Sequence, residues 1–576
     1  MKIAHYTIGL CFFLASLSSF SQVQTVGTFI NEENAMDGYT LVFPFNSKDI
    51  FLINNCGQKV HEWKTATPTL VAYLQPNGDI IKAGMDLTPA FGNPGVHGIV
   101  ERYNWNGTKV WSHKISNDSM VLHHDIEVLP NGNILVNAWK KMDPIQKHLL
   151  GRDTSLMSNK DELWDEVIME LAPRGTKDAD VVWQWRASEH LIQDFDSNLD
   201  NYGTISEHPE LLNINFAATG SGVSMDWLHF NSITYNENLD QILLSCLTFN
   251  EIFIIDHSAN NSEVSGHFGG ISGKGGDILY RYGNPAAYNK GTLSDKKSFG
   301  QHDPNWIKYG DYAGNIIFFN NGSTRGYSSI DIIELPWDGN NYATESNGVF
   351  GPTSPVYSYT KDIKSSFFSP VMSNTEILPN GNIFACEATK GKLTEYDITN
   401  GEIVWEYVNP VSDVKVAKQG EEYSGRTFRT FKYDSDYAAF TNRSLTPGLP
   451  LEQDPWPSDC NGIDTTTKQD TTKQDTTKQD TTHTGGGAWV NNATNQVISV
   501  YPNPSNGSIN ITASATVEDI KVYDIAGKLV ARQERLYANE TARFDLINCA
   551  NGLYFVSFVN DGFTHTHRLI LNNDNR

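Results

Sequence analysis

A short phrase that recurs along the chain sets the strongest limit on its fold. The segment LQPNGDIIKAG at Leu74 returns as LPNGNILVNAW at Leu129 and as LPNGNIFACEA at Leu378, each time an Asn-Gly turn followed by an apolar strand. A second phrase that carries tryptophan, such as GTKVWSH at Gly107 and GEIVWEY at Gly401, accompanies it. A repeated unit of short strands buries its apolar face only by stacking on its neighbours. The repeats therefore predict an all-β fold.

The number of repeats indicates the architecture. Two degenerate copies, at Asn231 and Asp303, keep the pattern of short apolar strands but lack the Asn-Gly turn. The strands from Gly38 onward form the first unit of the series. Together the copies make about six units, and units of this size, with aromatic residues and glycines that recur in each, predict a six-bladed β-propeller. A β-solenoid is the structural alternative, although its repeats would be shorter and more uniform.

The start of the chain has the pattern of an export signal. Lys2 precedes an apolar run from Ile8 to Leu17, which is too short to cross a bilayer, and small side chains follow at Ser19 and Ser21. We predict a signal peptide over residues 1–21, with a buried N-terminal helix as the alternative. No later stretch reaches the ~20 apolar residues of a membrane helix, so we expect no transmembrane segment.

A low-complexity segment divides the rest of the chain. From Asp464 the sequence repeats DTTKQ, and GGG follows at Gly485. Such a segment buries too little apolar surface to offset its ordering entropy, so we predict a disordered linker over residues 464–490. A glycan-bearing spacer is the alternative. The linker separates a large domain at 22–463 from a small one at 491–576.

The small domain alternates apolar and polar residues as half-buried strands do, which predicts a small C-terminal β-sandwich. The phrases YPNP at Tyr501, VYDIAGKLV at Val522 and GLYFV at Gly552 resemble the C-terminal sorting domain of the type IX secretion system. The resemblance implies that the type IX secretion machinery reads this tail. It also implies a protein that is secreted or attached to the cell surface.

Charge and cysteine content exclude several classes of partner. The formal net charge of -24 argues against nucleic acid, whose phosphates need a basic face. An anionic substrate must therefore meet local positive groups. The five cysteines that follow the signal peptide have no paired spacing, so they indicate neither a disulfide framework nor a zinc motif. We expect no metal and no cofactor.

Histidines occupy matched places in three repeats. They lie in HHDIEV from His123, in DWLHFNS around His229 and in FGQHDPNW around His302. The innermost strand of each propeller blade lines the central channel, so these segments are expected to converge there. Histidine serves as nucleophile or base near neutral pH. Core histidines bonded to backbone groups are the alternative, but three in register favour a site.

The stretch from Gly38 to Pro410 resembles the bacterial arylsulfotransferase family. The motifs that carry the resemblance are HHDIEVLPNGNILV, DWLHFNS, NEIFIIDHS, FGQHD and NGEIVWEYVNP. It implies a six-bladed propeller that transfers a sulfuryl group from an aryl sulfate donor to a phenolic acceptor, without a nucleotide donor. The sequence agrees, because no phosphate-cradling glycine loop with a following lysine comes after a strand.

The resemblance also implies roles for individual residues. His302 would be the nucleophile that becomes transiently sulfated, and His229 and Asn231 would hold the sulfuryl oxygens. His124 would either do the same or protonate the leaving oxygen.

Two adjacent histidines compete for that last role. We choose His124 over His123 because Asp125 follows it directly and could fix the orientation of its imidazole. His123 is placed among the substrate-binding residues.

One position departs from the family pattern. Where the family has an arginine, this chain reads Ser245, Cys246, Leu247. A guanidinium holds two oxygens of a tetrahedral anion, and leucine holds none. A catalytically weakened or inactive surface propeller that binds aryl or sulfated ligands is therefore the alternative function, and a structural surface protein is a third. Arg325 is the candidate to replace the missing cation, with a surface-turn arginine as its alternative role.

Overall fold

The computed structural model describes residues 24–571, apart from 158–161, 218–224, 422, 424, 457–497, 503–504, 506, 525–527, 539 and 561–562. The predicted signal peptide and the predicted linker lie outside the described residues. Two compact units are present, one within residues 1–469 and one within 470–576. Among the described residues the only α-helix is α1 (Pro144–Leu149), and strands dominate both units. The prediction of an all-β protein is confirmed.

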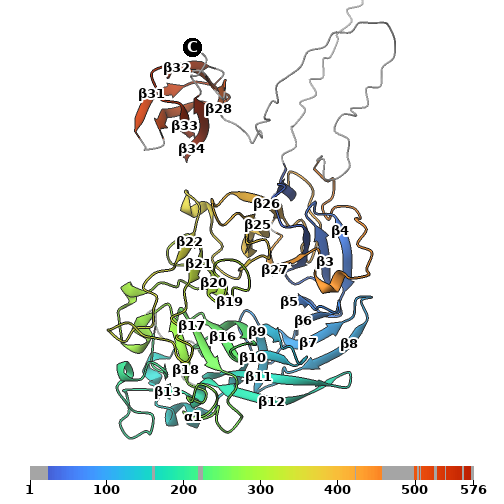
Figure 1. Cartoon of the computed structure of the whole chain (residues 1–576), viewed down its shortest axis with the longest axis vertical. Coiled ribbons are helices and arrows are strands. Elements are labelled where there is room, and N and C mark those ends of the chain that lie inside the picture. Colours follow the sequence, from blue (N-terminus) through green and yellow to red (C-terminus); the bar gives the residue numbers. More distant parts are fainter. Residues whose placement is uncertain are drawn as a thin grey trace, which may run out of the picture. The chain divides into compact units, whose positions relative to one another are not determined.

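Six antiparallel sheets follow one another through the described part of the large unit (Figure 1). The first two comprise β27 (Thr427–Asp434), β2 (Gly38–Pro44), β3 (Asp49–Asn54) and β4 (Lys59–Lys64), then β5 (Thr69–Leu74), β6 (Ile80–Met85), β7 (Gly98–Tyr103) and β8 (Lys109–Lys114). The next two comprise β9 (Met120–Val128), β10 (Ile134–Lys141), β11 (Trp164–Arg174) and β12 (Asp178–Arg186), then β15 (Phe230–Asn236), β16 (Gln241–Cys246), β17 (Glu251–Asp256) and β18 (Ile278–Tyr282).

The fifth and sixth sheets complete the series. They comprise β19 (His302–Trp306), β20 (Ile316–Asn320), β21 (Ser329–Ile333) and β22 (Tyr357–Tyr359), then β23 (Asn374–Ile377), β24 (Ile383–Glu387), β25 (Lys392–Tyr396), β26 (Ile403–Val408) and β1 (Gly27–Asn31). A short parallel pair joins β13 (Leu191–Ile192) to β14 (Leu212–Asn213). The 3₁₀ turns are η1 (Thr154–Leu156), η2 (Ala187–Glu189), η3 (Ile205–Glu207), η4 (Pro285–Tyr288), η5 (Leu293–Asp295), η6 (Lys364–Ser366), η7 (Ala388–Lys390) and η8 (Ala438–Phe440).

The middle strands of these sheets are apolar on both faces. β17 reads EIFIID and β20 reads IIFFN, and every residue of both is buried. β-branched and aromatic side chains favour strands, and a strand covered on both faces reads as a continuous apolar run. The last strand β8, by contrast, exposes half of its residues. The sequence thus predicts sheets that stack face to face.

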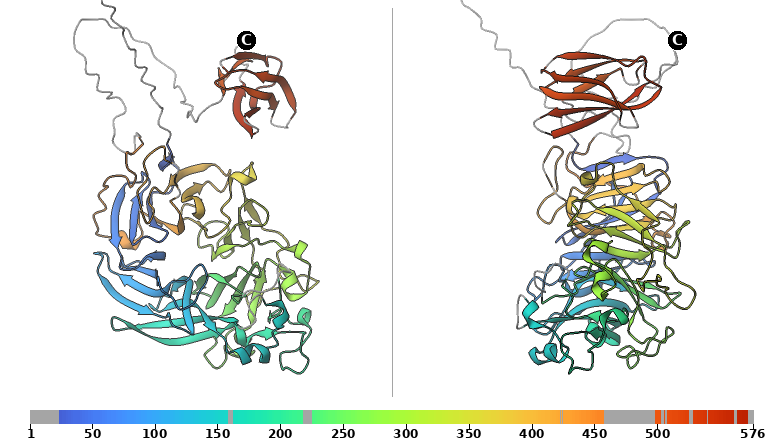
Figure 2. Two further views of the ribbon diagram at one scale, coloured as in Figure 1. Left: turned by 180° about the vertical axis from the view of Figure 1, so that it is seen from behind. Right: turned by 90° about the vertical axis from the view of Figure 1, so that its left-hand side faces the viewer.

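The first strands of successive sheets lie side by side. They contact one another in the order β27, β5, β9, β15, β19 and β23. The series closes on itself, because the Asn374 side chain on β23 donates to the Thr430 carbonyl oxygen on β27 at 2.6 Å and accepts from the Thr430 amide at 3.0 Å. β27 also pairs with β2, so a late segment of the chain completes the first sheet. Figure 2 shows the sheets from behind and from the side.

Both repeated phrases have a structural role. The glycine of each Asn-Gly turn has a left-handed backbone, with φ of 88° at Gly78, 86° at Gly132 and 89° at Gly381. The tryptophan of the second phrase donates its indole N–H to a backbone carbonyl of the next sheet. These pairs are Trp63 with Asn104 (3.2 Å), Trp111 with Asp178 (2.9 Å), Trp183 with Ala259 (2.8 Å) and Trp405 with Asn55 (2.8 Å). The last pair joins the sixth sheet to the first.

The small unit consists of two antiparallel sheets that share one apolar core. Their strands are β28 (Ile498–Tyr501), β29 (Ser508–Ala513) and β32 (Thr541–Asp545), and β31 (Leu529–Leu536), β30 (Val517–Asp524), β33 (Gly552–Asn560) and β34 (Phe563–Leu571). Ile509 and Ile511 of the first sheet and Val522 and Val556 of the second belong to that core.

Two further observations complete the fold. Cys56 takes part in a disulfide bond, which the cysteine spacing did not reveal, whereas Cys246 and Cys386 are buried free thiols. Among the described residues, none of the helices combines the length and the hydropathy that spanning a bilayer requires.

Candidate functional site

The structure brings the histidines of three repeats together on or next to three adjacent first strands, β9, β15 and β19. His123 and His124 lie on β9, His229 directly precedes β15, and His302 begins β19. The rings of His124 and His229 have centroids 4.4 Å apart in an edge-to-face arrangement. The strand β15 contacts both β9 and β19, so the three histidine segments lie side by side.

The backbone is distorted in the same way at each of these three places. His124, His229 and Asp303 have φ values of 57°, 55° and 53°, in the left-handed region that non-glycine residues rarely adopt. The pairing register shifts beside each of them. Such bulges re-aim side chains, and each left-handed residue costs about 1–2 kcal/mol. Backbone strain of this kind concentrates at functional sites.

Hydrogen bonds define which nitrogen of His302 carries the proton. Its Nδ1 lies 2.9 Å from the Oδ1 of Asn321 and 3.1 Å from the carbonyl oxygen of Gly300, both of which accept. The amide of Met372 donates to Nε2 at 3.2 Å. Nδ1 therefore holds the proton and Nε2 offers the lone pair. Burial and the nearby Arg429 charge lower the pKa of His302 to about 3, so the ring is neutral.

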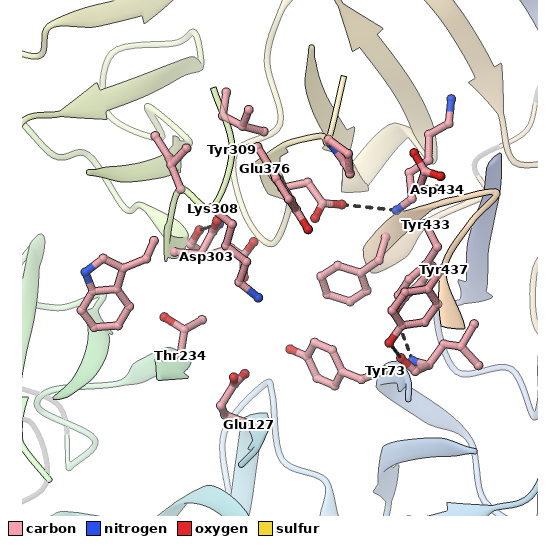
Figure 3. A pocket seen from close by; sticks show the side chains of 18 of the residues that line it. Tyr73, Glu127, Thr234, Asp303, Lys308, Tyr309, Glu376, Tyr433, Asp434 and Tyr437 are labelled. Carbon is pink, nitrogen blue, oxygen red and sulfur yellow. Dashed lines mark hydrogen bonds between the residues drawn. The ribbon is translucent and has the colours of Figure 1, made fainter. Parts of the chain in front are cut away.

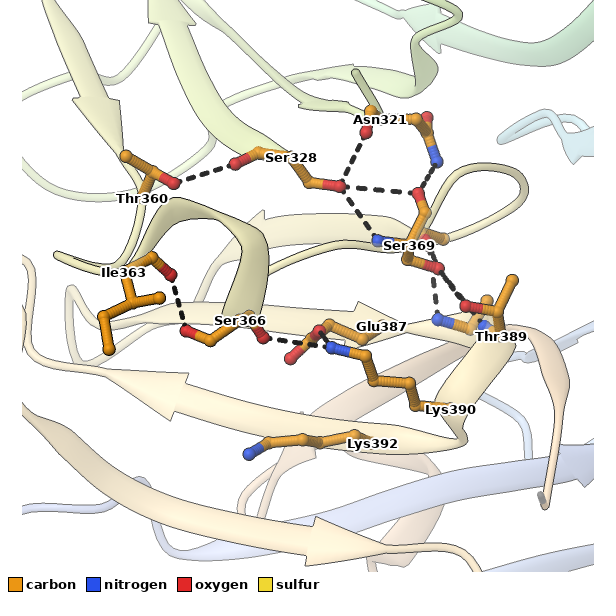
Figure 4. A network of polar contacts seen from close by, with 12 residues as sticks. Asn321, Ser328, Thr360, Ile363, Ser366, Ser369, Glu387, Thr389, Lys390 and Lys392 are labelled. Carbon is orange, nitrogen blue, oxygen red and sulfur yellow. Dashed lines mark hydrogen bonds and ion pairs between the residues drawn. The ribbon is translucent and has the colours of Figure 1, made fainter. Parts of the chain in front are cut away.

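Asn321 was not predicted from the sequence, and its orientation is fixed. Its Nδ2 donates to the carbonyl oxygens of Ser369 and Met372, each at 2.8 Å, so Oδ1 is the atom that faces His302. The Ser328 hydroxyl donates to the Asn321 carbonyl at 2.7 Å and accepts from the Ser369 amide at 3.0 Å (Figure 4). Ser369 also bonds the Thr389 hydroxyl at 3.0 Å. This network holds the amide that positions His302.

His123 lies behind His124. Its Nδ1 is 3.0 Å from Nδ1 of His124, and its Nε2 is 2.9 Å from Oε2 of Glu166. The ring also stacks on Trp139 at 3.9 Å. Both ring nitrogens of His123 thus face protein groups, an arrangement that supports His124. Burial lowers the pKa of both imidazoles, to about 3 at His123 and well below the usual value at His124.

His229 differs from the other histidines in its charge. Its Nδ1 lies 2.5 Å from Oδ2 of Asp226, which also accepts from the Asn93 amide group at 3.0 Å. Burial opposes a charge on His229, but the Asp226 carboxylate and the charge of Glu166 outweigh it and raise the pKa of His229 above its usual value. The side chain is 16% exposed, so a ligand can reach it. Asp226 belongs to the DWLHFNS motif, although nothing in the motif itself singled it out.

Asp125 does not orient His124, although its adjacency in the sequence predicted this role. The carboxylate instead accepts from the Tyr73 hydroxyl at 2.7 Å and pairs with Arg429 Nη1 at 2.6 Å. His124 is positioned by its backbone, whose amide donates to the Gly95 carbonyl at 2.7 Å, and by the neighbouring rings. A Cβ built on Gly95 would lie 2.2 Å from Nε2 of His124, so only glycine fits there.

Arg429 lies behind the histidines and was not anticipated. It is fully buried on β27 and pairs with Asp125 and with Oδ1 of Asp303 at 2.9 Å. Its Nη2 donates to the Asn231 carbonyl at 2.9 Å. The Asn231 side chain itself donates to the Gln301 carbonyl at 2.9 Å. The charge of Arg429 is thus balanced by two carboxylates.

Leu247 occupies the place where the family arginine was expected, next to the histidines. Its amide donates to the His229 carbonyl at 3.2 Å. Its Cδ1 lies 3.7 Å from where a Cβ on Gly300 would stand, two residues before His302.

Arg325 has the contacts of a turn residue. Its guanidinium donates to the carbonyls of Tyr327 (3.0 Å) and Asn320 (3.1 Å) and to the Ser329 hydroxyl (2.6 Å), and it lies over the Phe299 ring. These contacts match the alternative role that the sequence left open.

A cavity of about 430 Å³ lies toward the far ends of the same first strands (Figure 3). Glu127, Asp303, Lys308 and Glu376 line it together with several tyrosines. Burial raises the pKa of Glu127 to about 8 and that of Glu376 to about 7. Asp303 joins the two regions, because it lines this cavity and also pairs with Arg429.

The solved structures that resemble the chain differ widely in sequence. A protein of unknown function from Bacteroides caccae is 14% identical with a TM-score of 0.32, over 64% of this chain and 93% of that one. A putative 6-phosphogluconolactonase from Bacteroides fragilis is 10% identical with a TM-score of 0.34, over 70% and 99%. A catalytically inactive virginiamycin B lyase from Staphylococcus aureus is 11% identical with a TM-score of 0.30, over 68% and 90%. Among curated proteins, none matches the chain.

Two family profiles match the sequence. The secretion system C-terminal sorting domain matches residues 499–572, so the protein is secreted or attached to the cell surface. The family described as Arylsulfotransferase (ASST) matches residues 94–425, more than half of the chain, and this span contains all of the matched histidine segments. The chain belongs to the arylsulfotransferase family and ends in a type IX secretion sorting domain.

Proposed function

We propose that the protein transfers a sulfuryl group from an aryl sulfate ester to a phenolic acceptor through a sulfohistidine at His302. The observation that carries the proposal is the neutral imidazole of His302, with its proton held on Nδ1 by Asn321 and its lone pair on Nε2. A nitrogen nucleophile needs this tautomer and this charge. The expected aryl sulfate donor and phenolic acceptor both follow from the family.

In the first half-reaction Nε2 attacks sulfur. The N–S bond forms while the bond from sulfur to the aryl oxygen breaks, and the phenoxide leaves with the electron pair. The ring then carries a positive charge, which the Asn321 oxygen stabilises through the Nδ1 proton. The Met372 amide occupies the Nε2 lone pair at 3.2 Å, so its release accompanies the approach of the donor. In the second half-reaction the acceptor oxygen attacks sulfur, loses its proton to a base, and the N–S bond breaks.

We propose that His229 supplies the positive charge that interacts with the sulfuryl oxygens. Its raised pKa favours the imidazolium form, and its ring faces His124 at the partly exposed side of the site. An imidazolium here would bind the sulfuryl oxygens or give its proton to the leaving phenoxide. His124, which burial keeps neutral, would act on the same oxygens, with His123 and Glu166 behind it.

A weakened or inactive binding propeller is the second candidate, and Leu247 favours it. Arg429 pairs with Asp125 and Asp303, and Arg325 is hydrogen-bonded within its own turn. Both guanidinium groups therefore already have protein partners and do not replace the family arginine. Removal of one preorganised donor from a comparable site costs about 100- to 1000-fold in rate. On this alternative the pocket would bind aryl or sulfated ligands with little turnover.

We infer that the six sheets are the blades of a β-propeller and that the small unit is a β-sandwich. The closed series of first strands from β27 to β23 and the tryptophan contacts between sheets support the propeller. The shared core of two sheets supports the sandwich. We propose that residues 22–463 form the working domain, 464–490 a linker, and 491–576 the domain that the export machinery reads after a signal peptide at 1–21.

Release of phenol from a chromogenic aryl sulfate tests the proposed function. We expect release that depends on His302 and increases when a phenolic acceptor is added, because the acceptor discharges the sulfated enzyme. Absence of release by the parent protein, together with its appearance in Leu247→Arg, would select the inactive binding propeller. Absence of release in both would contradict the enzymatic proposal.

A further inference from the structure

A second cluster of histidine and carboxylate groups lies outside the proposed active site. His190 follows η2 at the end of the third sheet, His267 lies in the loop between β17 and β18, and Asp277 directly precedes β18. The ligand atoms of the three side chains all lie within 4.8 Å of one another. His190 and Asp277 are 87 residues apart in sequence, so no spacing pattern could have revealed the cluster.

The contacts of His190 show which of its two ring nitrogens carries the lone pair. Nε2 lies 2.9 Å from the carbonyl oxygen of Val264, which can only accept, so Nε2 carries the proton. In the neutral ring Nδ1 is therefore an acceptor, and it faces Oδ1 of Asp277 at 2.9 Å. Nδ1 of His267 lies 2.8 Å from that same oxygen. Two imidazole nitrogens thus converge on one carboxylate oxygen, and because Nδ1 of His190 and this oxygen are both acceptors, a proton or a metal ion must lie between them.

The surroundings hold His190 in the orientation of a metal ligand. Its ring is fully buried and stacks on Trp185, with centroids 5.5 Å apart and planes 5° apart. The Trp185 indole donates to the Gly276 carbonyl at 2.7 Å, and a Cβ on Gly276 would lie 2.6 Å from Nε2 of His190. A metal-binding histidine typically donates its second N–H to a carbonyl that fixes the ring, as Val264 does here.

A cavity of about 740 Å³ gives access to the cluster. His267 and Asp277 line it, and so do His208 and Glu210, which pair with each other at 3.0 Å. The His267 side chain is 51% exposed. An ion at the cluster would therefore have an entry path and room for water as an additional ligand.

We propose that His190, His267 and Asp277 bind a zinc ion. Two imidazoles and one carboxylate, with a position open to solvent, form a set that suits Zn²⁺, whose bonds to nitrogen are about 2.0–2.1 Å long. Ligands of a tetrahedral zinc ion are about 3.3 Å apart, so the Asp277 oxygen, now 2.9 Å and 2.8 Å from the two nitrogens, would shift outward to admit the ion. The ion would tie the end of the third sheet to the loop that precedes β18. This inference is independent of the sulfotransferase proposal.

Zinc titration of the metal-stripped full-length protein tests the proposal. We use Zn²⁺ itself as the probe, with binding followed by calorimetry and stability followed by the melting temperature. The parent protein is expected to bind zinc at this site and to melt at a higher temperature in its presence. His267→Ala removes a largely exposed ligand, and Asp277→Asn removes the shared carboxylate. Each is expected to weaken binding at least about 100-fold, the upper range for loss of a supporting residue.

His113→Ala is the matched control, because His113 lies on β8 with its Nδ1 against the Lys177 carbonyl. It should titrate as the parent does. A parent protein that takes up no zinc, or variants His267→Ala and Asp277→Asn that bind zinc and gain melting temperature as the parent does, would overturn the proposal. Unchanged far-ultraviolet circular dichroism of His267→Ala shows that lost binding is not lost folding.

Discussion

The Oδ1 oxygen of Asn321 lies 2.9 Å from the Nδ1 nitrogen of His302. His302 begins β19, and Asn321 directly follows β20, the next strand of the same sheet. Two carbonyl oxygens accept from the Asn321 amide group, so the oxygen cannot turn away without the loss of both bonds. The proton of His302 is therefore confined to Nδ1. Asn321 is a positioning residue for the proposed nucleophile.

Replacement of Asn321 is expected to reduce turnover. Asn321→Leu removes the acceptor and should lower kcat about 10- to 100-fold, the range for residues that orient a reacting group. Asn321→Asp keeps an acceptor oxygen and should retain more activity than Asn321→Leu. Steady-state kinetics on an aryl sulfate give kcat and KM, and thermal melting separates a loss of stability from a loss of tautomer control. Equal rates for Asn321→Leu and the parent would rule out the positioning role.

The pH dependence of activity is expected to report the charge of His229. The Asp226 carboxylate raises the pKa of His229, so the imidazolium persists to a higher pH than an ordinary histidine and is lost as the pH rises through that pKa. Asp226→Asn removes the carboxylate, so activity that needs the cation should begin to fall at a lower pH. The measurement is kcat/KM against pH for the parent and the variant. A high-pH limb at the same position in both would show that His229 does not supply the charge.

Gly95 is expected to be irreplaceable because it faces His124. A Cβ at Gly95 would overlap the imidazole, whereas Gly132 has a similar positive φ and open space around it. Gly95→Ala and Gly132→Ala should share a backbone cost of about 1 kcal/mol. Only Gly95→Ala should lower kcat/KM, by about tenfold or more, because a shift near 1 Å in a reacting group has effects of this order. Similar kinetics for the two variants would exclude a role for the Gly95 contact.

Introduction of an arginine at Leu247 is expected to increase the rate. The residue adjoins His229 and Gly300, so a guanidinium there could bind sulfuryl oxygens. Leu247→Arg should raise kcat by up to about 100- to 1000-fold, and Leu247→Met, which keeps the volume without the charge, should not. A rate for Leu247→Arg no higher than that of Leu247→Met would show that His229 already supplies the required charge.

The repeated phrases made the fold predictable in outline. The Asn-Gly turns at Gly78, Gly132 and Gly381 and the tryptophans of the second phrase are local signals, and the all-β prediction is confirmed. The site was predictable only where a motif carried it. Arg429 pairs with Asp125 across 304 residues, so no local pattern links them. Asn321 and Glu166 were missed for the same reason, because they act through contacts between separate strands and not through a phrase of their own.

Detection of sulfated His302 tests the account most directly. The parent protein and His302→Ala are incubated with an aryl sulfate in the absence of acceptor, then digested under alkaline conditions that preserve a nitrogen–sulfur bond, and the peptides are analysed by mass spectrometry. We expect the peptide that contains His302 to gain the mass of one sulfuryl group in the parent protein, and to lose it when a phenol is added. Phenol release by the parent protein without any sulfated His302 peptide, or with the sulfuryl group on another histidine, would contradict the account.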